Sequence, residues 1–240
     1  MSNLEKQVAI ITGGGTGIGR AVALALAGAG VKVVVCGRRL APLEQTVRDI
    51  DLLGGEAVAI QADVAQAGEV QQVVDRTVKQ FGAVNILVKN AGISGGDYIH
   101  QHDIENWDRV MAVNLRGPFL FARSVLPLMR AQGGGHIINI SSESGLEYYE
   151  GNGAYGVAKH ALNALGEFIQ RENQDHNIRL NTICPGMVIT EMTEGRPGLN
   201  QDKSLQGDDI AELVLWLLTR RKNIKIGRPI LIQTMENPWQ

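Results

Sequence analysis

The chain alternates short β-branched runs with longer segments of helical periodicity, and this alternation restricts its fold more than any other feature. Seven runs predict strands, at residues 8–12, 31–36, 57–62, 86–88, 136–140, 179–183 and 229–232. Six segments between them predict helices, at residues 18–29, 41–53, 69–81, 104–130, 154–174 and 208–218. Strands that alternate with helices imply β-α-β crossovers. We therefore expect an α/β fold with a doubly wound, parallel sheet of about seven strands and helices on both faces.

The 240 residues predict one domain that spans the whole chain, residues 1–240. Within the long helical segment 104–130, Pro118 should kink or divide the helix because it lacks a backbone N–H. Residues 191–206 carry Gly195, Pro197 and Gly198 and have no clear periodicity. We interpret them as a lid over a binding site, with an ordinary surface loop as the alternative.

Composition excludes several classes of function. The net charge is −2 and there is no long basic run, so we expect no nucleic-acid partner. No apolar stretch approaches 18 residues, so we expect neither a membrane span nor a signal peptide, and a cytoplasmic location. Cys36 and Cys184 lie far apart and outside any metal-ligand spacing. We therefore expect no metal site, and two buried free thiols.

A glycine-rich turn follows the first predicted strand and leads directly into a helix. It reads Gly13-Gly14-Gly15-Thr16-Gly17-Ile18-Gly19. Backbone N–H groups at a helix N-terminus attract phosphate, and glycine lets a pyrophosphate approach the backbone closely. At the first β-α junction of a doubly wound fold, such a turn predicts dinucleotide binding.

The end of the second strand indicates which dinucleotide binds. An acidic residue there would bind the adenosine ribose of NAD, but this chain has Gly37, followed by Arg38 and Arg39. Arginine pairs well with a 2′-phosphate, so the sequence favours NADP(H) over NAD(H). The alternative is that both arginines are simply solvated. Asp63, after the third strand, should meet the adenine edge.

Tyr155 and Lys159 lie four residues apart near the start of a predicted helix, and hence on one face. A free phenol titrates near pH ~10, and a neighbouring ammonium lowers that pKa. We therefore expect a general acid/base pair suited to the interconversion of a carbonyl and an alcohol. Ser142, directly after the strand at 136–140, should hydrogen-bond the substrate oxygen. Ser141, on the opposite face of the strand, is the alternative, and Ser144 a weaker one.

Between about residues 7 and 218 the chain resembles the short-chain dehydrogenase/reductase family, whose core is a Rossmann fold. Besides the glycine turn and Ser142, Tyr155 and Lys159, the resemblance rests on Asp63-Val64, Asn90-Ala91-Gly92, Val113-Asn114-Leu115 and Pro185-Gly186, in the family's order.

The resemblance implies specific roles for these residues. Asn90, Ala91 and Gly92 would support the adenosine side of the cofactor. Asn114 would join the catalytic set by holding a water that relays protons from Lys159, which would also bind the nicotinamide ribose. Val188 and Thr190 would grip the carboxamide. The predicted cofactor-binding residues are Gly13, Thr16, Gly17, Ile18, Gly19, Arg38, Arg39, Asp63, Val64, Asn90, Ala91, Gly92, Tyr155, Lys159, Pro185, Gly186, Val188 and Thr190.

Two positions depart from the family pattern. Lys89 stands where a second asparagine often precedes Asn90. The last strand is followed by Gln233–Gln240 instead of an acidic-glycine ending that often packs between subunits. The resemblance still implies a homo-oligomer, a tetramer or a dimer.

The sequence thus predicts an NADP(H)-dependent oxidoreductase acting on a small carbonyl or alcohol substrate, similar to 3-oxoacyl-carrier-protein reductases and general ketoreductases. The substrate could be free or linked to CoA or a carrier protein. Alternatives are an NAD-dependent alcohol, sugar or polyol dehydrogenase, a non-catalytic nucleotide sensor, and an epimerase or dehydratase. Tyr149 should line the substrate pocket together with Leu146 and Tyr148, with ordinary packing or subunit contacts as the alternative. Glu147, Glu150 and Asn152 should make the pocket more polar.

Overall fold

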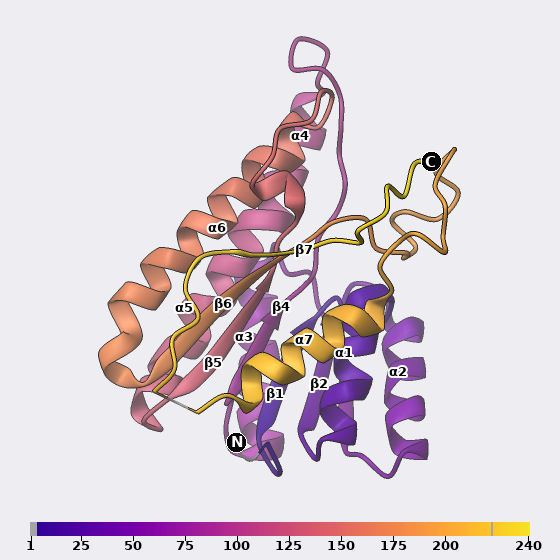
Figure 1. Ribbon diagram of the computed structural model, residues 1–240. Coiled ribbons are helices and arrows are strands. Elements are labelled where there is room, and N and C mark those ends of the chain that lie inside the picture. The colour runs from indigo at the N-terminus through magenta and orange to yellow at the C-terminus, as the bar shows by residue number, and fades with distance from the viewer. Residues whose placement is uncertain (1–3, 222) are drawn as a thin grey trace.

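The computed structural model describes residues 4–221 and 223–240, and their strands form one seven-stranded sheet (Figure 1). All strand pairs are parallel, and the spatial order is β3-β2-β1-β4-β5-β6-β7. The strands are β1 (Val8–Thr12), β2 (Lys32–Gly37), β3 (Ala57–Gln61), β4 (Ile86–Lys89), β5 (Gly135–Ile140), β6 (Ile178–Pro185) and β7 (Ile230–Ile232). The order reverses after β3, so the sheet is doubly wound, and the predicted Rossmann fold is confirmed.

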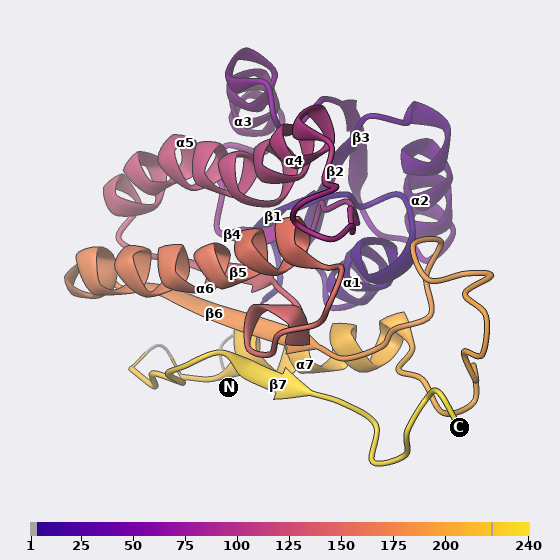
Figure 2. The ribbon, with the colours of Figure 1, turned by 90° about the horizontal axis from the view of Figure 1, so that it is seen from above.

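Helices cover both faces of the sheet (Figure 2). One face packs against α1 (Gly17–Gly28), α2 (Leu40–Leu52) and α7 (Gly207–Thr219). The other packs against α3 (Ala67–Phe81), α5 (Gly117–Ala131) and α6 (Gly153–Asn173). Because both faces are buried, the central strands carry continuous apolar runs instead of an alternating pattern, as in Val8-Ala9-Ile10-Ile11 of β1 and Val33-Val34-Val35 of β2.

The long helical segment that we expected at 104–130 is divided. It consists of α4 (Ile104–Met111), a π-helical turn (Ala112–Arg116) and α5, whose first turn holds Pro118. In an α-helix the N–H of residue 118 would donate to the carbonyl of Asn114, and proline has none. The helix instead widens into a π-helical turn, in which each hydrogen bond spans one more residue than in an α-helix. The N–H of Gly117 donates to the carbonyl of Ala112. The predicted division is confirmed, and it falls at Asn114.

The described residues contain no helix with both the length and the apolar content that crossing a bilayer requires. Within residues 4–221 and 223–240 there is also no group of three or more His, Cys, Asp or Glu side chains arranged to hold a metal ion. Cys36 and Cys184 are both buried and free, so the expectation for the thiols is confirmed.

Lys89 is a charged residue inside the core, at the carboxyl end of β4. Its side chain is 2% exposed, and its Nζ has no hydrogen-bond partner among the described residues. Its neighbour in register on β5 is Asn139, whose Oδ1 is also buried without a partner. Burial lowers the pKa of Lys89 to about 7. An ammonium in such surroundings destabilises the fold.

We predict that Lys89→Met stabilises the protein, because methionine keeps the length of the side chain and removes the charge. The pKa of Lys89 falls from 10.5 in the unfolded chain to about 7 in the fold, so the unfolded state binds more protons between these values. The destabilisation is therefore largest below pH 7 and is lost as the pH rises toward 10.5. The free energy of unfolding should rise by roughly 2–4 kcal/mol at pH 7.

Urea denaturation of both proteins at several pH values between 6 and 10 measures this effect. Lys79→Met, at an exposed position of α3, is the control and should change stability little. A Lys89→Met gain that is absent, or that does not shrink with rising pH, would contradict the account.

Candidate active site

A cavity of about 930 Å³ lies at the carboxyl ends of the strands, where ligands bind in open α/β sheets. It is lined by every predicted site residue except Gly19 and Asn114. The first strands supply the glycine turn and residues 37–39 and 62–64, and β4 to β6 supply residues 90–96, 140–144 and 185–188. The fold therefore brings together segments that are widely separated in the sequence.

The glycine turn depends on close contacts between backbones. Gly13 and Gly17 adopt positive φ angles of 66° and 52°. A Cβ on Gly19 would lie 2.3 Å from the carbonyl oxygen of Gly13 and 2.5 Å from Nδ2 of Asn90. Gly19 thus sits beneath the cavity and sets the position of the turn. Thr16, the N-cap residue of α1, makes no side-chain capping bond, and the first turn holds no acidic residue. The N-terminal N–H groups of α1 are therefore available to an anion.

Thr12 and Asn90 tie this turn to the end of β4. The hydroxyl oxygen of Thr12 accepts hydrogen bonds from the backbone N–H groups of Asn90 and Ala91, each at 3.0 Å. The Nδ2 of Asn90 lies 3.0 Å from the carbonyl of Thr12 and 3.2 Å from that of Gly13, and donates to them. Asn90 thus braces the glycine turn from inside the protein, and Thr12 is a supporting residue that the sequence did not reveal.

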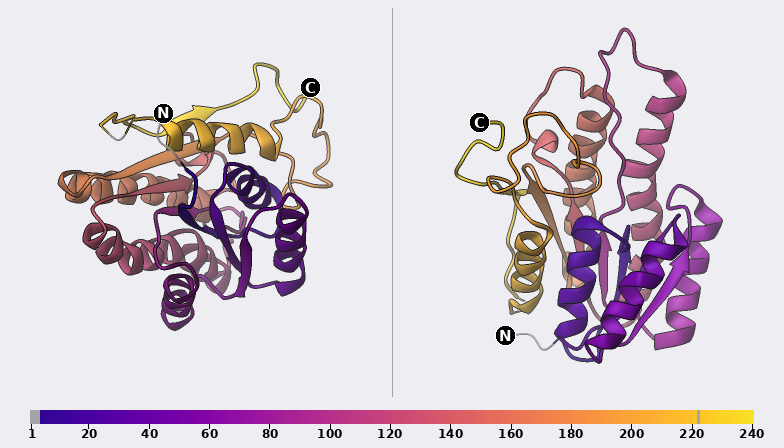
Figure 3. Two further views of the ribbon diagram at one scale, coloured as in Figure 1. Left: turned by 90° about the horizontal axis from the view of Figure 1, so that it is seen from below. Right: turned by 90° about the vertical axis from the view of Figure 1, so that its right-hand side faces the viewer.

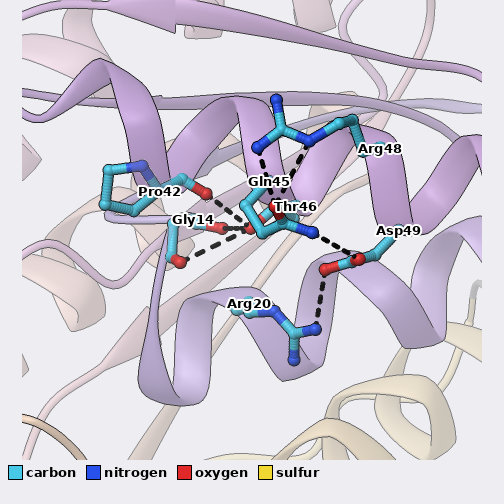
Figure 4. A network of polar contacts seen from close by, with 8 residues as sticks. Gly14, Arg20, Pro42, Gln45, Thr46, Arg48 and Asp49 are labelled. Atoms are coloured by element: carbon cyan, nitrogen blue, oxygen red, sulfur yellow. Dashed lines mark hydrogen bonds and ion pairs between the residues drawn. The ribbon is translucent and has the colours of Figure 1, made fainter.

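A second network supports the turn from α2 (Figure 4). The buried hydroxyl of Thr46 lies 3.1 Å from the carbonyl oxygen of Gly14, to which it donates. On the next turn, Arg20 of α1 donates to Asp49 of α2 at 2.8 Å. This hydrogen bond is the main cause that lowers the pKa of Asp49. The glycine turn is therefore held from two sides.

At the end of β2, the two predicted arginines differ in their contacts. Arg39 pairs with Glu191 at 2.5 Å, across the cavity rim. The side chain of Arg38 lines the cavity and has no ion-pair partner among the described residues. A Cβ on Gly37 would meet nothing closer than 3.8 Å, so this position has room for a side chain. Among the described residues, the guanidinium of Arg38 is therefore unpaired, and it lies next to Gly37, where the sequence has no acidic side chain.

Tyr155 and Lys159 lie one turn apart on α6, as predicted, with the Lys159 Nζ 5.4 Å from the centroid of the Tyr155 ring. Lys159 is 4% exposed and donates from Nζ to the carbonyl of Ile140 at 3.0 Å. Burial lowers its pKa to about 8, so it is mostly an ammonium at neutral pH.

The pKa of Tyr155 differs from our expectation. Burial raises it above that of a free phenol, and this effect outweighs the lowering by a hydrogen bond with Ser142 and by the charge of Arg196. Our prediction of a lowered pKa was wrong, because it counted the nearby cation and not the loss of water around the phenol. Tyr155 is therefore a neutral phenol at neutral pH, which is the form that donates a proton.

Of the serines after β5, Ser142 is the one that reaches Tyr155. Its Oγ accepts a hydrogen bond from the N–H of Ser144 at 3.1 Å, which leaves its own hydrogen available to donate. Ser141 is 4% exposed, and its hydroxyl contacts the carbonyl of Lys159 at 3.4 Å. Ser144 is also buried, and its Oγ accepts from Asn152. The geometry supports Ser142 over both alternatives.

Asn114 is buried behind the cavity and does not line it. Both ends of its amide bind the backbone of Ile93: Oδ1 accepts from the N–H and Nδ2 donates to the carbonyl, each at 2.8 Å. A Cβ on Gly92 would lie 3.1 Å from Asn114 Oδ1 and 3.7 Å from Lys159 Nζ, so these groups flank Gly92. The side chain of Asn114 therefore positions the loop after β4.

The end of β6 and the segment that follows it form another wall of the cavity. Pro185, Gly186, Val188 and Thr190 all line it. A Cβ on Gly17 would lie 2.9 Å from the Thr190 Cγ2, so this segment packs directly against the glycine turn.

Several lining residues were not predicted from the sequence: Glu143, Met187, Met192, Arg196 and Trp239. Met192 and Arg196 belong to residues 191–206, which we interpreted as a lid, but no periodicity or motif marks any of these five residues individually. The prediction for Tyr149, Glu150 and Asn152 agrees with the cavity lining, whereas Leu146, Glu147 and Tyr148 lie outside it. Tyr148 is 87% exposed and stacks on His160, so its prediction was wrong.

Comparisons with known proteins agree with this geometry. A family model described as short chain dehydrogenase matches residues 7–198. A 2-(R)-hydroxypropyl-CoM dehydrogenase of Xanthobacter autotrophicus is 39% identical, covering 79% of this chain and 78% of that protein. A 3-oxoacyl-(acyl-carrier-protein) reductase of Synechocystis is 38% identical, covering 86% and 83%. The solved structure of a metagenomic short-chain oxidoreductase in complex with NADP superposes with a TM-score of 0.86 at 31% identity, covering 98% and 100%.

We predict that Gly19→Ala disrupts the glycine turn. The new methyl group would meet the carbonyl of Gly13 at 2.3 Å, so the turn or α1 must move. We expect a loss of stability of roughly 1–3 kcal/mol and at least ~10-fold weaker dinucleotide binding.

Thermal denaturation and a fluorescence titration with NADPH measure the two effects. Gly28→Ala, at the other end of α1, is the matched control, because a Cβ there meets nothing within 4 Å. If both variants bind the nucleotide as the parent does, the turn does not depend on this contact.

Proposed function

The chain belongs to the short-chain dehydrogenase/reductase family, and on that premise we propose that it is an NADP(H)-dependent carbonyl reductase, reversible as an alcohol dehydrogenase. The observation that carries the proposal is the convergence of Ser142, Tyr155 and Lys159 on one cavity with the glycine turn. A protein that only senses nucleotides would not require this set of proton-transfer groups.

The residues around the cavity fit a phosphorylated dinucleotide. Gly13 and Gly17 leave the backbone open, and the N-terminus of α1 offers N–H groups to a pyrophosphate. Arg38 is a free guanidinium where a 2′-phosphate would lie, beside Gly37 in place of an acid. The matched structure of the metagenomic oxidoreductase is a complex with NADP, which supports this assignment. The bound nicotinamide would supply or accept the hydride.

In the proposed reduction, Tyr155 gives a proton to the substrate oxygen. Its raised pKa keeps the phenol protonated at neutral pH, as a proton donor requires. Ser142 would donate a second hydrogen bond to the same oxygen as negative charge develops, since its Oγ already accepts from Ser144. Two donors thus converge on one oxygen.

Lys159 has the role of returning the proton to Tyr155 and of holding the nicotinamide ribose. Its ammonium uses one N–H on Ile140, which leaves two for these contacts. Asn114 acts as a positioning residue, because its amide fixes Ile93 and thereby the loop that borders Lys159.

The two named relatives act on hydroxyalkyl and 3-oxoacyl compounds joined to a carrier. By similarity to these relatives, we propose 3-oxoacyl groups linked to CoA or a carrier protein as one substrate class for this chain. Free ketones are the second class that we propose.

The proposal includes self-association and a cytoplasmic location. Phe119 of α5 and Phe168 of α6 are 47% and 65% exposed. Apolar side chains of this size on neighbouring helices suit contact with a second copy. The two free, buried thiols suit a reducing compartment.

Tyr155→Phe tests the proposed chemistry. We expect kcat for the reduction of a ketone to fall by about 10²–10⁴-fold, because the proton donor is lost, with little change in NADPH affinity. Loss of NADPH absorbance against a panel of ketones, 3-oxoesters and 3-oxoacyl-CoA measures the rate. Tyr148→Phe, outside the cavity, is the control. Full activity of Tyr155→Phe, or no activity of the parent with any carbonyl compound, would refute the proposal.

Gly37→Asp tests the nucleotide preference. The site has room for the side chain, and a carboxylate there would repel a 2′-phosphate. We expect kcat/KM with NADPH to fall at least ~10-fold and the preference to move toward NADH. Gly37→Asn, of equal size and without charge, should have a smaller effect. A parent enzyme that prefers NADH would overturn the assignment.

A further inference from the structure

Three segments enclose the substrate end of the cavity, beyond Tyr155. They are the loop before α6, which contributes Tyr149 and Asn152, the segment 191–206, which contributes Arg196, and the C-terminal tail, which contributes Trp239. We refer to residues 191–206 as the lid segment and to residues 233–240 as the tail. The last two segments lie outside the residues on which the family resemblance rests, so they are where this chain can differ from its relatives.

The tail makes a hydrogen bond and an ion pair with the lid segment, and a hydrogen bond with Glu143 in the turn after β5. The N–H of Asn200 donates to the carbonyl of Pro238 at 2.8 Å, and Lys203 pairs with Glu236 at 3.4 Å. The Nε2 of Gln233 donates to Glu143 at 2.6 Å. Figures 1 and 2 and the right panel of Figure 3 all draw the C-terminus beside the loop between β6 and α7. These contacts hold Trp239, which is 46% exposed, at the cavity wall.

The charged groups at this end of the cavity differ in whether the protein already pairs them. Glu143 accepts from Gln233 and from Tyr149, and Glu150 accepts from the hydroxyl of Tyr98 at 3.4 Å. The guanidinium of Arg196 has no hydrogen-bond or ion-pair partner among the described residues, although it lines the same cavity. The acids are therefore satisfied by protein donors, and the arginine is the group left to bind a ligand.

The turn that carries Arg196 is anchored to the wall of the cavity. The hydroxyl of Thr193, a residue that is 9% exposed, donates to the carbonyl of Val188 at 2.7 Å and accepts from the N–H of Thr190 at 2.9 Å. The N–H of Arg196 in turn donates to the carbonyl of Thr193 at 3.3 Å. Arg196 thus extends from a turn whose base is fixed in the wall of the same cavity.

We propose that the natural substrate is a carbonyl compound that carries an oxyanion, such as a carboxylate, and that Arg196 binds this anion while Trp239 packs against the intervening carbons. This inference rests on the proposed reductase function and adds the class of substrate. A guanidinium forms two parallel hydrogen bonds with a carboxylate, so it selects such a substrate over a neutral ketone of the same shape. The charge of Arg196 also acts on the Tyr155 hydroxyl, which agrees with a location near the reacting atoms.

Matched pairs of substrates test the proposal. Each pair is a keto acid and its amide, which have nearly the same size and differ in charge: 3-oxobutanoate, 4-oxopentanoate and 5-oxohexanoate with their amides. For the parent enzyme with NADPH, we expect kcat/KM to be at least ~10-fold higher for the acid in the pair of the right length. Arg196→Gln should reduce the value for that acid by about 10–100-fold and leave its amide nearly unchanged.

Two variants serve as controls. Arg123→Gln removes the same charge from an exposed position on α5 outside the cavity, and it should not change the preference for the acid. Arg196→Lys keeps the charge without the planar fork, so it should restore part of the preference. A separate binding measurement avoids turnover: pentanoate and pentanamide are titrated against the NADP-bound protein by calorimetry. Pentanoate should bind more tightly, and Arg196→Gln should remove the difference.

The outcomes separate the two proposals. If amides and acids react equally well and Arg196→Gln changes neither, the anion site is refuted while the reductase function stands. If no carbonyl compound is reduced, the reductase function fails, and the binding measurement still decides whether Arg196 selects an anion. An equal loss of acid preference in Arg123→Gln would show that overall charge, and not contact with Arg196, is responsible.

Discussion

The close approach of three backbone segments at the carboxyl end of β1 is the constraint on which the site depends. Gly13, the start of α1 and the loop after β4 meet at distances that leave no space for a Cβ at Gly19. Thr12 and Asn90 then use their side chains to join these backbones, so the polar groups of the turn are satisfied without blocking the cavity. Because the parallel strands end at the same edge, this junction fixes both the N-terminal end of α1 and the loop that borders Lys159.

Burial sets the directions of the pKa shifts of the two candidate catalytic groups, Tyr155 and Lys159. Lys159 and Tyr155 are adjacent, yet the loss of water around each opposes its charged form: the pKa of the lysine falls and that of the tyrosine rises. The result at neutral pH is a neutral phenol beside a mostly charged ammonium, a combination that suits the delivery of a proton to a carbonyl oxygen. Burial also lowers the pKa of Lys89, but this lysine lies outside the cavity and its buried Nζ has no partner among the described residues.

The π-helical turn connects the fold to the site. Pro118 cannot supply the N–H that would continue the α-helix across the carbonyl of Asn114, so the helix widens there. The amide of Asn114 then binds Ile93 on both sides and holds the loop next to Gly92 and Lys159. One proline thereby accounts for the division of a long helix at a position that serves the active site.

Patterns within the sequence were enough to predict the doubly wound sheet, the glycine turn after β1 and the placement of Tyr155 and Lys159 on one face of a helix. These features depend on local periodicity, on glycine spacing and on the geometry of one helical turn, all of which can be read from neighbouring residues. Packing of the whole chain sets the direction of the pKa shift of Tyr155, the pairing of Arg39 with Glu191, and the presence of Arg196 and Trp239 in the cavity wall. Burial and contacts between distant, irregular segments arise only when the chain packs. The sequence therefore marked residues 191–206 as a lid but did not single out Arg196 within it, or Trp239.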